Sequence, residues 1–186
     1  MQSIIVSASA RHPMSPYDPI TLDKESVAKS QLESAIKLWS ENGDAASIHT
    51  LAAAANVVFD ALGKRIKAPS FIREYLRGAS KGQYNTFTEA EVFFKHAARD
   101  LNLALEYDRM QAELLIFDSI CVYEALHKED KTLPMLFFLL YFSLHHPRYF
   151  DDVWALPLPK GFEPENLASL NRAKFFTKMA VLLASE

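Results

Sequence analysis

The feature that most constrains the fold of this chain is the run from Ser47 to Leu62, which has strong helical character. Its sixteen residues carry one formal charge, on Asp60, and one imidazole, on His49. A helix that is apolar or small almost all the way round belongs inside a protein, surrounded by other helices. The four consecutive alanines 52–55 lack bulk and let neighbouring backbones come close. The run therefore predicts a central, buried helix.

The composition favours one soluble helical domain. A length of 186 residues fits one domain with a sizeable core. Thirteen Phe and seven Tyr against five Gly favour bulky side chains in a helical core over a turn-rich β fold. The single Cys121 excludes an intramolecular disulfide and a cysteine-based zinc cluster. Because this usage is typical of a reducing compartment, we expect a cytoplasmic protein.

Apolar periodicity divides the chain into an irregular arm, residues 1–20, and one helical-bundle domain, residues 21–186. The expected helix ends are Asn42-Gly43 and Gly63, the expected cap is Ser47, and Thr86 with Glu89 forms a capping box. The predicted fold is an all-α bundle of six or seven helices, at about 22–42, 47–62, 70–77, 87–101, 108–127, 132–146 and 165–183.

No segment is expected to enter a membrane. The most apolar run, Leu133 to Leu144, has about a dozen residues, whereas a helix that spans a bilayer needs roughly 20. The first residues lack the basic start and the long apolar stretch of a signal peptide. A net charge of −3 argues against a nucleic-acid footprint over the whole protein.

Polar residues on three predicted helices form the chain's one candidate chemical site. His49 lies on one flank of the central helix, while His96 and Asp100 are i, i+4 neighbours on the 87–101 helix. Asp118 points the same way as apolar residues of its own helix, and a buried carboxylate needs a partner. If these four side chains converge between helices, they could ligate a divalent metal or act as an acid–base pair.

The alternative is a polar network in which each histidine bonds a carboxylate or a backbone carbonyl. The residue pattern favours this alternative because its spacing matches no known ligand set, and the motifs of zinc proteases, P-loops and dinucleotide sites are absent. Cys121 follows Asp118 on an apolar face and is expected to be a buried thiol. His145 and His146 are expected to serve the C-terminal end of their helix.

The segment from Gly63 to Gly82 is the one strongly basic stretch. Its six cations face one acid, Glu74, and Phe71, Tyr75 and Tyr84 are interleaved with them. Such a mixture is typical of surfaces that bind nucleic acid or an acidic partner. The net negative charge of the whole chain favours a solvated surface without a partner instead. The six basic residues are Lys64, Arg65, Lys67, Arg73, Arg77 and Lys81.

Two segments resemble a family of uncharacterised, mostly bacterial, all-helical proteins. They are Ser47-Ile-His-Thr-Leu-Ala-Ala-Ala-Ala and Phe93-Phe-Lys-His-Ala-Ala-Arg-Asp, and the resemblance covers roughly residues 24 to 125. The chain departs from the family pattern at Val92, where Asn is expected, and at Ala98, where Asp is expected. The resemblance implies a helical fold and no established activity.

Three functions follow from these patterns. The first is a non-enzymatic helical binding or interaction module that self-associates as a homodimer. The basis for the dimer is apolar surface, at Val92 and Phe93 and along Phe175, Phe176, Met179, Val181 and Leu182 of the last helix. The second is an enzyme that uses His49, His96, Asp100 and Asp118. The third is a protein that binds nucleic acid or an acidic partner through residues 64–81.

Overall fold

The computed structural model describes residues 19–95, 104–128, 131–150 and 163–184, and these ranges contain helices and no β-strand. The predicted all-α class is confirmed. The predicted arm lies outside the described residues except for residues 19 and 20. The described helices are α1 (Lys24–Ser40), α2 (Ala45–Ile66), α3 (Phe71–Gly78), α4 (Lys81–Lys95), α5 (Met110–His127), α6 (Leu133–His145), a 3₁₀ turn η1 (Pro147–Tyr149), α7 (Pro164–Ala168) and α8 (Arg172–Leu183).

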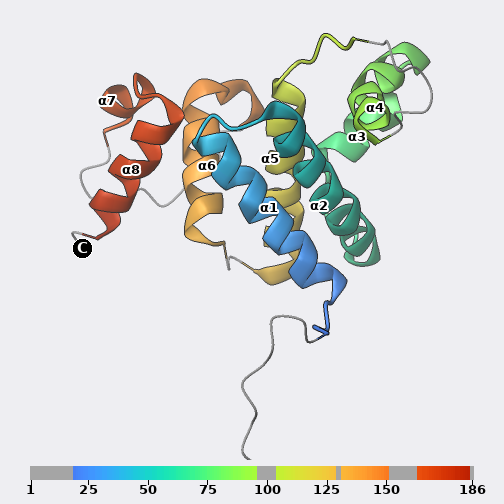
Figure 1. Cartoon of the computed structure of the whole chain (residues 1–186), viewed down its shortest axis with the longest axis horizontal. Coiled ribbons are helices and arrows are strands. Elements are labelled where there is room, and N and C mark those ends of the chain that lie inside the picture. The colour runs from blue at the N-terminus through green and yellow to red at the C-terminus, as the bar shows by residue number, and fades with distance from the viewer. Residues whose placement is uncertain (1–18, 96–103, 129–130, 151–162, 185–186) are drawn as a thin grey trace, which may run out of the picture.

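The centre of the bundle is formed by α1, α2, α5 and α6. Helix α2 packs against α1 and α5. Helix α6 also packs against α1 and α5. In Figure 1, α3 and α4 lie at one end of the molecule, while α7 and α8 lie beyond α6 at the other. A second apolar cluster joins α6, α7 and α8, and Tyr141 and Phe176 pack against both clusters, so the two cores are continuous.

The central helix α2 is longer than the sequence pattern predicts. Asp44, not Ser47, is its N-cap, since the Asp44 carboxylate accepts the amide of Ser47 at 2.7 Å. Gly63 does not end the helix, which continues to Ile66, and Lys67 takes the left-handed conformation instead. A β-carbon on Gly63 would lie 2.6 Å from Cγ1 of Val122, so this glycine allows α5 to approach. Its role is close packing.

By length and hydropathy, α2 is the one described helix that would suffice to cross a bilayer. Its alanines Ala52, Ala53 and Ala55 are buried, as expected for a core helix. Side chains from α1 and α5 cover these positions. Core helices pass the same test, and the burial of these alanines between two neighbouring helices fits a core helix.

Other boundaries also differ from the sequence pattern. Helix α1 ends as predicted, but Asn42 (φ 54°) is the left-handed residue, while the amide of Gly43 bonds the Leu38 carbonyl at 2.8 Å. Helix α4 begins at Lys81, so the capping box at Thr86 lies inside a helix and is wrong. A capping pattern is a weak local signal that the rest of the fold overrides. The predicted last helix is two helices, because Asn171 caps α8 by accepting the amide of Lys174. Among the described residues, this split and η1 raise the number of helices above the predicted six or seven.

Candidate functional site

Asp118 on α5 is fully buried and holds the start of α3. One carboxylate oxygen accepts the Asn56 amide at 2.8 Å and the Ser70 hydroxyl at 3.1 Å, and the other accepts the backbone N–H of Ile72 at 3.2 Å. Burial raises the pKa of Asp118, although the hydrogen bonds from Asn56, Ile72 and Ser70 oppose that shift. The predicted need for partners is confirmed. Because these donors occupy both oxygens in a closed environment, Asp118 positions a helix.

A second set of contacts ties α3 to α2. Arg73 donates from Nε to the Asp60 carboxylate at 2.7 Å and from Nη1 to the Ala68 carbonyl at 3.1 Å. Lys64 reaches the other Asp60 oxygen at 2.6 Å. Burial acts to raise the pKa of Asp60, but Lys64 and Arg73 outweigh it and leave the pKa below its ordinary value. Two of the six predicted basic residues are therefore engaged within the fold.

His49 is 2% exposed and packs edge-on against the rings of Phe94 and Tyr107. Its Nδ1 lies 3.0 Å from the Tyr107 hydroxyl, which also accepts the backbone N–H of Ala112. Burial raises the pKa of Tyr107 to about 12. At neutral pH the hydroxyl therefore keeps its proton. His49 is buried, as predicted, but the contact of its Nδ1 is with a tyrosine hydroxyl, where a carboxylate or a carbonyl was expected.

Of the four predicted site residues, the structure describes His49 and Asp118, and these two do not share a set of contacts. His96 and Asp100 lie outside the described residues. His49 sits two helical turns before Asn56, the residue that bonds Asp118, which is about 10 Å along the axis of α2. Within the described part of the chain, no three His, Cys, Asp or Glu side chains come close enough to hold a metal ion.

Glu124 and His127 form the chain's one Glu-x-x-His pair, a spacing that di-iron helical bundles use on two helices. Their side chains turn to different partners. Glu124 binds Lys131, and Nε2 of His127 lies 2.6 Å from the Glu25 carboxylate on α1. These contacts join the ends of neighbouring helices.

The remaining reactive side chains also have structural surroundings. Burial raises the pKa of the Cys121 thiol well above its ordinary value, so the thiolate nucleophile is disfavoured. His145 bonds the Tyr141 carbonyl at 2.8 Å, which confirms its role at the end of α6. His146 lies with its Nε2 3.4 Å from the Glu113 carboxylate. The adjacent imidazoles thus contact different groups.

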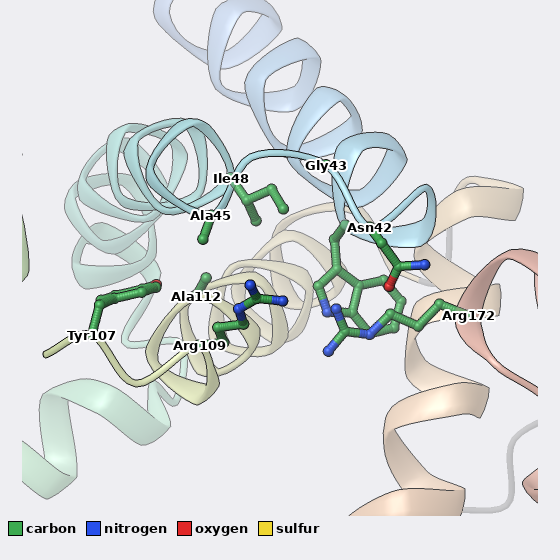
Figure 2. Close-up of a pocket in the computed structure, with 9 residues that line it drawn as sticks. Asn42, Gly43, Ala45, Ile48, Tyr107, Arg109, Ala112 and Arg172 are labelled. Carbon is green, nitrogen blue, oxygen red and sulfur yellow. The ribbon is translucent and has the colours of Figure 1, made fainter.

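A pocket lies where the end of α1 meets the starts of α2, α5 and α8. It is a small hollow whose accessible space, about 10 Å³, has room for about one water molecule. We call it the Arg109–Arg172 pocket. Figure 2 shows Arg109 entering from the start of α5 and Arg172 from α8, with both guanidinium groups pointing to the middle of the pocket. Its lining residues are Trp39, Asn42, Gly43, Ala45, Ile48, Tyr107, Arg109, Ala112 and Arg172.

A buried acid fixes one side of this pocket. Glu113 is 6% exposed, and its Oε1 accepts the indole N–H of Trp39 at 3.0 Å and a guanidinium N–H of Arg172. Arg172 thus carries a neutralising partner, and its position is set by the fold. Arg109 is exposed and has no ion pair among the described residues. The three side chains Arg109, Arg172 and Glu113 sum to one positive charge.

The pocket combines an apolar floor with cationic edges. Ile48 and Ala112 are buried, and the indole of Trp39 is 2% exposed. Three helices begin at the pocket, at Ala45, after Arg109 and at Arg172, and a helix N-terminus carries partial positive charge. Guanidinium groups bind carboxylates through paired hydrogen bonds. The arrangement presents positive charge to an anion at the mouth of the pocket.

Sequence patterns did not single out this pocket. Trp39, Arg109, Glu113 and Arg172 stand in no motif or spacing that indicates a site. One signal was present. Helix α5 is apolar on most sides, and an acid in its first turn, Glu113, is therefore expected to be buried. The partners of Glu113 lie 74 and 59 residues away, and no local pattern reports such contacts.

Comparison of the chain with protein-family models, with curated proteins and with solved structures finds no match in any of the three. The family resemblance of residues 24 to 125 therefore stays a prediction. The functional proposal rests on the side chains themselves.

Proposed function

We propose that the protein is a non-enzymatic helical binding module whose ligand is a small organic acid held in the Arg109–Arg172 pocket. The observation that supports it is the pair of guanidinium groups over a largely apolar lining. Converging polar groups beside apolar side chains are typical of the places where small molecules bind. The apolar body of the ligand would contact Trp39, Ile48 and Ala112.

Charge favours a ligand with one carboxylate. The sum of one positive charge over Arg109, Arg172 and Glu113 matches a single negative charge. Arg172 is held by Glu113 and by Trp39, so little entropy is lost when it meets the ligand. Arg109 is the exposed partner that would close on the carboxylate.

The side chains that line the pocket favour binding over catalysis. It contains no Cys, His, Asp or Glu. Its one titratable phenol, Tyr107, has a pKa raised by burial to about 12 and accepts the amide of Ala112, so it stays protonated. A general base or a nucleophile would have to come from elsewhere.

The test is a thermal-unfolding screen of the full chain with 3-phenylpropionate and hexanoate, each paired with its neutral primary amide. The acids should raise the unfolding temperature in proportion to the logarithm of concentration, and the amides should have little effect. Equal shifts with acids and amides, or no shift with any acid, would contradict the proposal.

The competing function is an acid–base or metal-assisted enzyme that uses His49, His96, Asp100 and Asp118. Elemental analysis of the purified protein separates the two. A divalent metal near one equivalent would favour the enzyme. A metal-free protein that binds the acids would favour the module.

A further inference from the structure

Two aromatic rings lie exposed on α3, and a half-buried ring of η1 meets one of them. Phe71 and Tyr75 are 37% and 45% exposed and stack with their ring centroids 6.5 Å apart. Tyr149 meets Phe71 edge-on at 5.4 Å, and the Arg148 guanidinium lies over the Tyr149 ring at 4.9 Å. We call these four residues the α3 platform. Large aromatic rings left in solvent on a folded domain commonly mark a binding surface.

Helix geometry separates the sides of α3. At about 100° per residue, Ile72 and Leu76 share the inward side, where Ile72 is buried. Phe71 and Tyr75 lie on one flank, towards Tyr149. Arg73 and Arg77 lie on the other flank, towards Asp60 of α2. Residues on the two flanks can therefore contact one elongated ligand that crosses α3.

Basic residues without an ion pair precede and follow α3 in the sequence. Arg73 and Lys64 are paired with Asp60, but Arg65, Lys67, Arg77 and Lys81 are exposed and have no ion pair among the described residues. Lys67 precedes the first residue of α3 and Lys81 follows its last. Glu74 is the lone acid on this helix. The local charge is thus strongly positive on an acidic protein.

We propose that the α3 platform and its flanking cations bind single-stranded nucleic acid. Bases stack on exposed aromatic rings without a need for a particular sequence, and the phosphates pair with Lys and Arg. An acidic peptide would use the cations but would gain little from the stacked rings. This surface and the Arg109–Arg172 pocket share no residue, so the two proposals stand or fall separately.

Fluorescence anisotropy with a labelled oligothymidylate tests the proposal on the full chain. At low salt we expect a dissociation constant of about 1–100 μM, as for sequence-independent binding. The logarithm of the binding constant should fall with the logarithm of salt concentration with a slope of about −3 if four cations contact phosphates. No binding at low salt would overturn the proposal.

Four variants locate the surface. Tyr75→Ala should weaken binding about fivefold or more with an unchanged salt slope, since it removes stacking. Arg77→Gln should reduce the magnitude of the slope by about 0.7. Glu74→Gln should strengthen binding, a gain that misfolding cannot produce. Lys174→Gln, a change of an exposed cation on α8 outside both proposed sites, should leave binding unchanged.

Competition with polyglutamate distinguishes the two classes of partner. Weak displacement of the oligonucleotide, together with the loss in Tyr75→Ala, supports nucleic acid. Equal affinity for polyglutamate with no effect of Tyr75→Ala would show a surface for acidic partners in general and overturn the proposal. A full-strength oligonucleotide affinity in both Tyr75→Ala and Arg77→Gln would also overturn it, because the binding would lie elsewhere.

Discussion

The guanidinium of Arg172 lies over the indole of Trp39, with its central carbon 4.4 Å from the ring centroid. Glu113 bonds both groups, since one carboxylate oxygen accepts the Trp39 N–H and an N–H of Arg172. The three side chains come from α1, α5 and α8, so each fixes the position of the other two. This contact places a guanidinium at the pocket before any ligand arrives.

The contacts of Asp118 predict a large cost for a small change. In Asp118→Asn, one acceptor oxygen becomes an amide donor that faces the donors of Asn56, Ser70 or Ile72. Each buried group left unpaired costs about 1–3 kcal/mol, so the free energy of unfolding should fall by about that amount or more. Urea unfolding measures it. Asp44→Asn, at an exposed cap, is the control and should change stability by less than about 1 kcal/mol. Equal effects of the two variants would show that Asp118 does not hold α3.

The two glycines Gly63 and Gly78 should respond in opposite directions to alanine. The new β-carbon in Gly63→Ala would meet Val122 at 2.6 Å, and overpacking costs about 1–3 kcal/mol. The β-carbon in Gly78→Ala would meet nothing within 4 Å, so the helix propensity of alanine should stabilise the chain by up to about 1 kcal/mol. Thermal unfolding of both variants measures this. A stabilised Gly63→Ala would mean that α2 and α5 are further apart than the structure shows.

Much of the helical architecture can be predicted from local sequence patterns. Most of the candidate sites cannot be predicted in this way. The apolar and small residues on all sides of α2 identify it as the central helix, and Asn42-Gly43 marks a real helix end. Gly63 was taken for a helix end because local propensity cannot register Val122, which is 59 residues further on.

The same limit applies to the candidate sites. The apolar face on which Asp118 lies indicates that the carboxylate needs partners if it is buried, but leaves its burial open. Its actual partners, from Asn56 to Ile72, are 46 to 62 residues away in sequence. The Arg109–Arg172 pocket depends on the meeting of four helix ends, and no period or spacing in the sequence records that meeting.

Asp60 predicts a specific pH dependence. Its pKa is held below the ordinary 3.8 in the folded chain, where Lys64 and Arg73 outweigh the opposing effect of burial. Its stabilising contribution is therefore complete above about pH 5 and is lost as the pH falls through the folded pKa. The difference in unfolding free energy between the native chain and Asp60→Asn should shrink between about pH 5 and pH 2. A difference that stays constant over that range would contradict the ion-pair assignment.

Self-association as a homodimer also remains a prediction. Phe175 and Met179 are buried against α6 and α7, so they no longer support it, whereas Val92 and Val181 are exposed. Light scattering at micromolar concentration should give twice the chain mass of 21.0 kDa. Val181→Lys should shift the mass to that of one chain if α8 forms the interface. A mass of one chain for the unaltered protein would refute the dimer.

The most direct test of the proposed function is calorimetric titration of 3-phenylpropionate into three proteins: the native chain, Arg109→Gln and Arg65→Gln. Arg65 is the matched control because it is an exposed arginine outside the pocket. We predict a dissociation constant of about 1 mM or tighter for the native chain and for Arg65→Gln. Loss of one charge-assisted hydrogen bond should weaken binding to Arg109→Gln about fivefold or more. Equal binding to all three proteins, or no heat of binding to the native chain, would contradict an organic-acid site in the Arg109–Arg172 pocket.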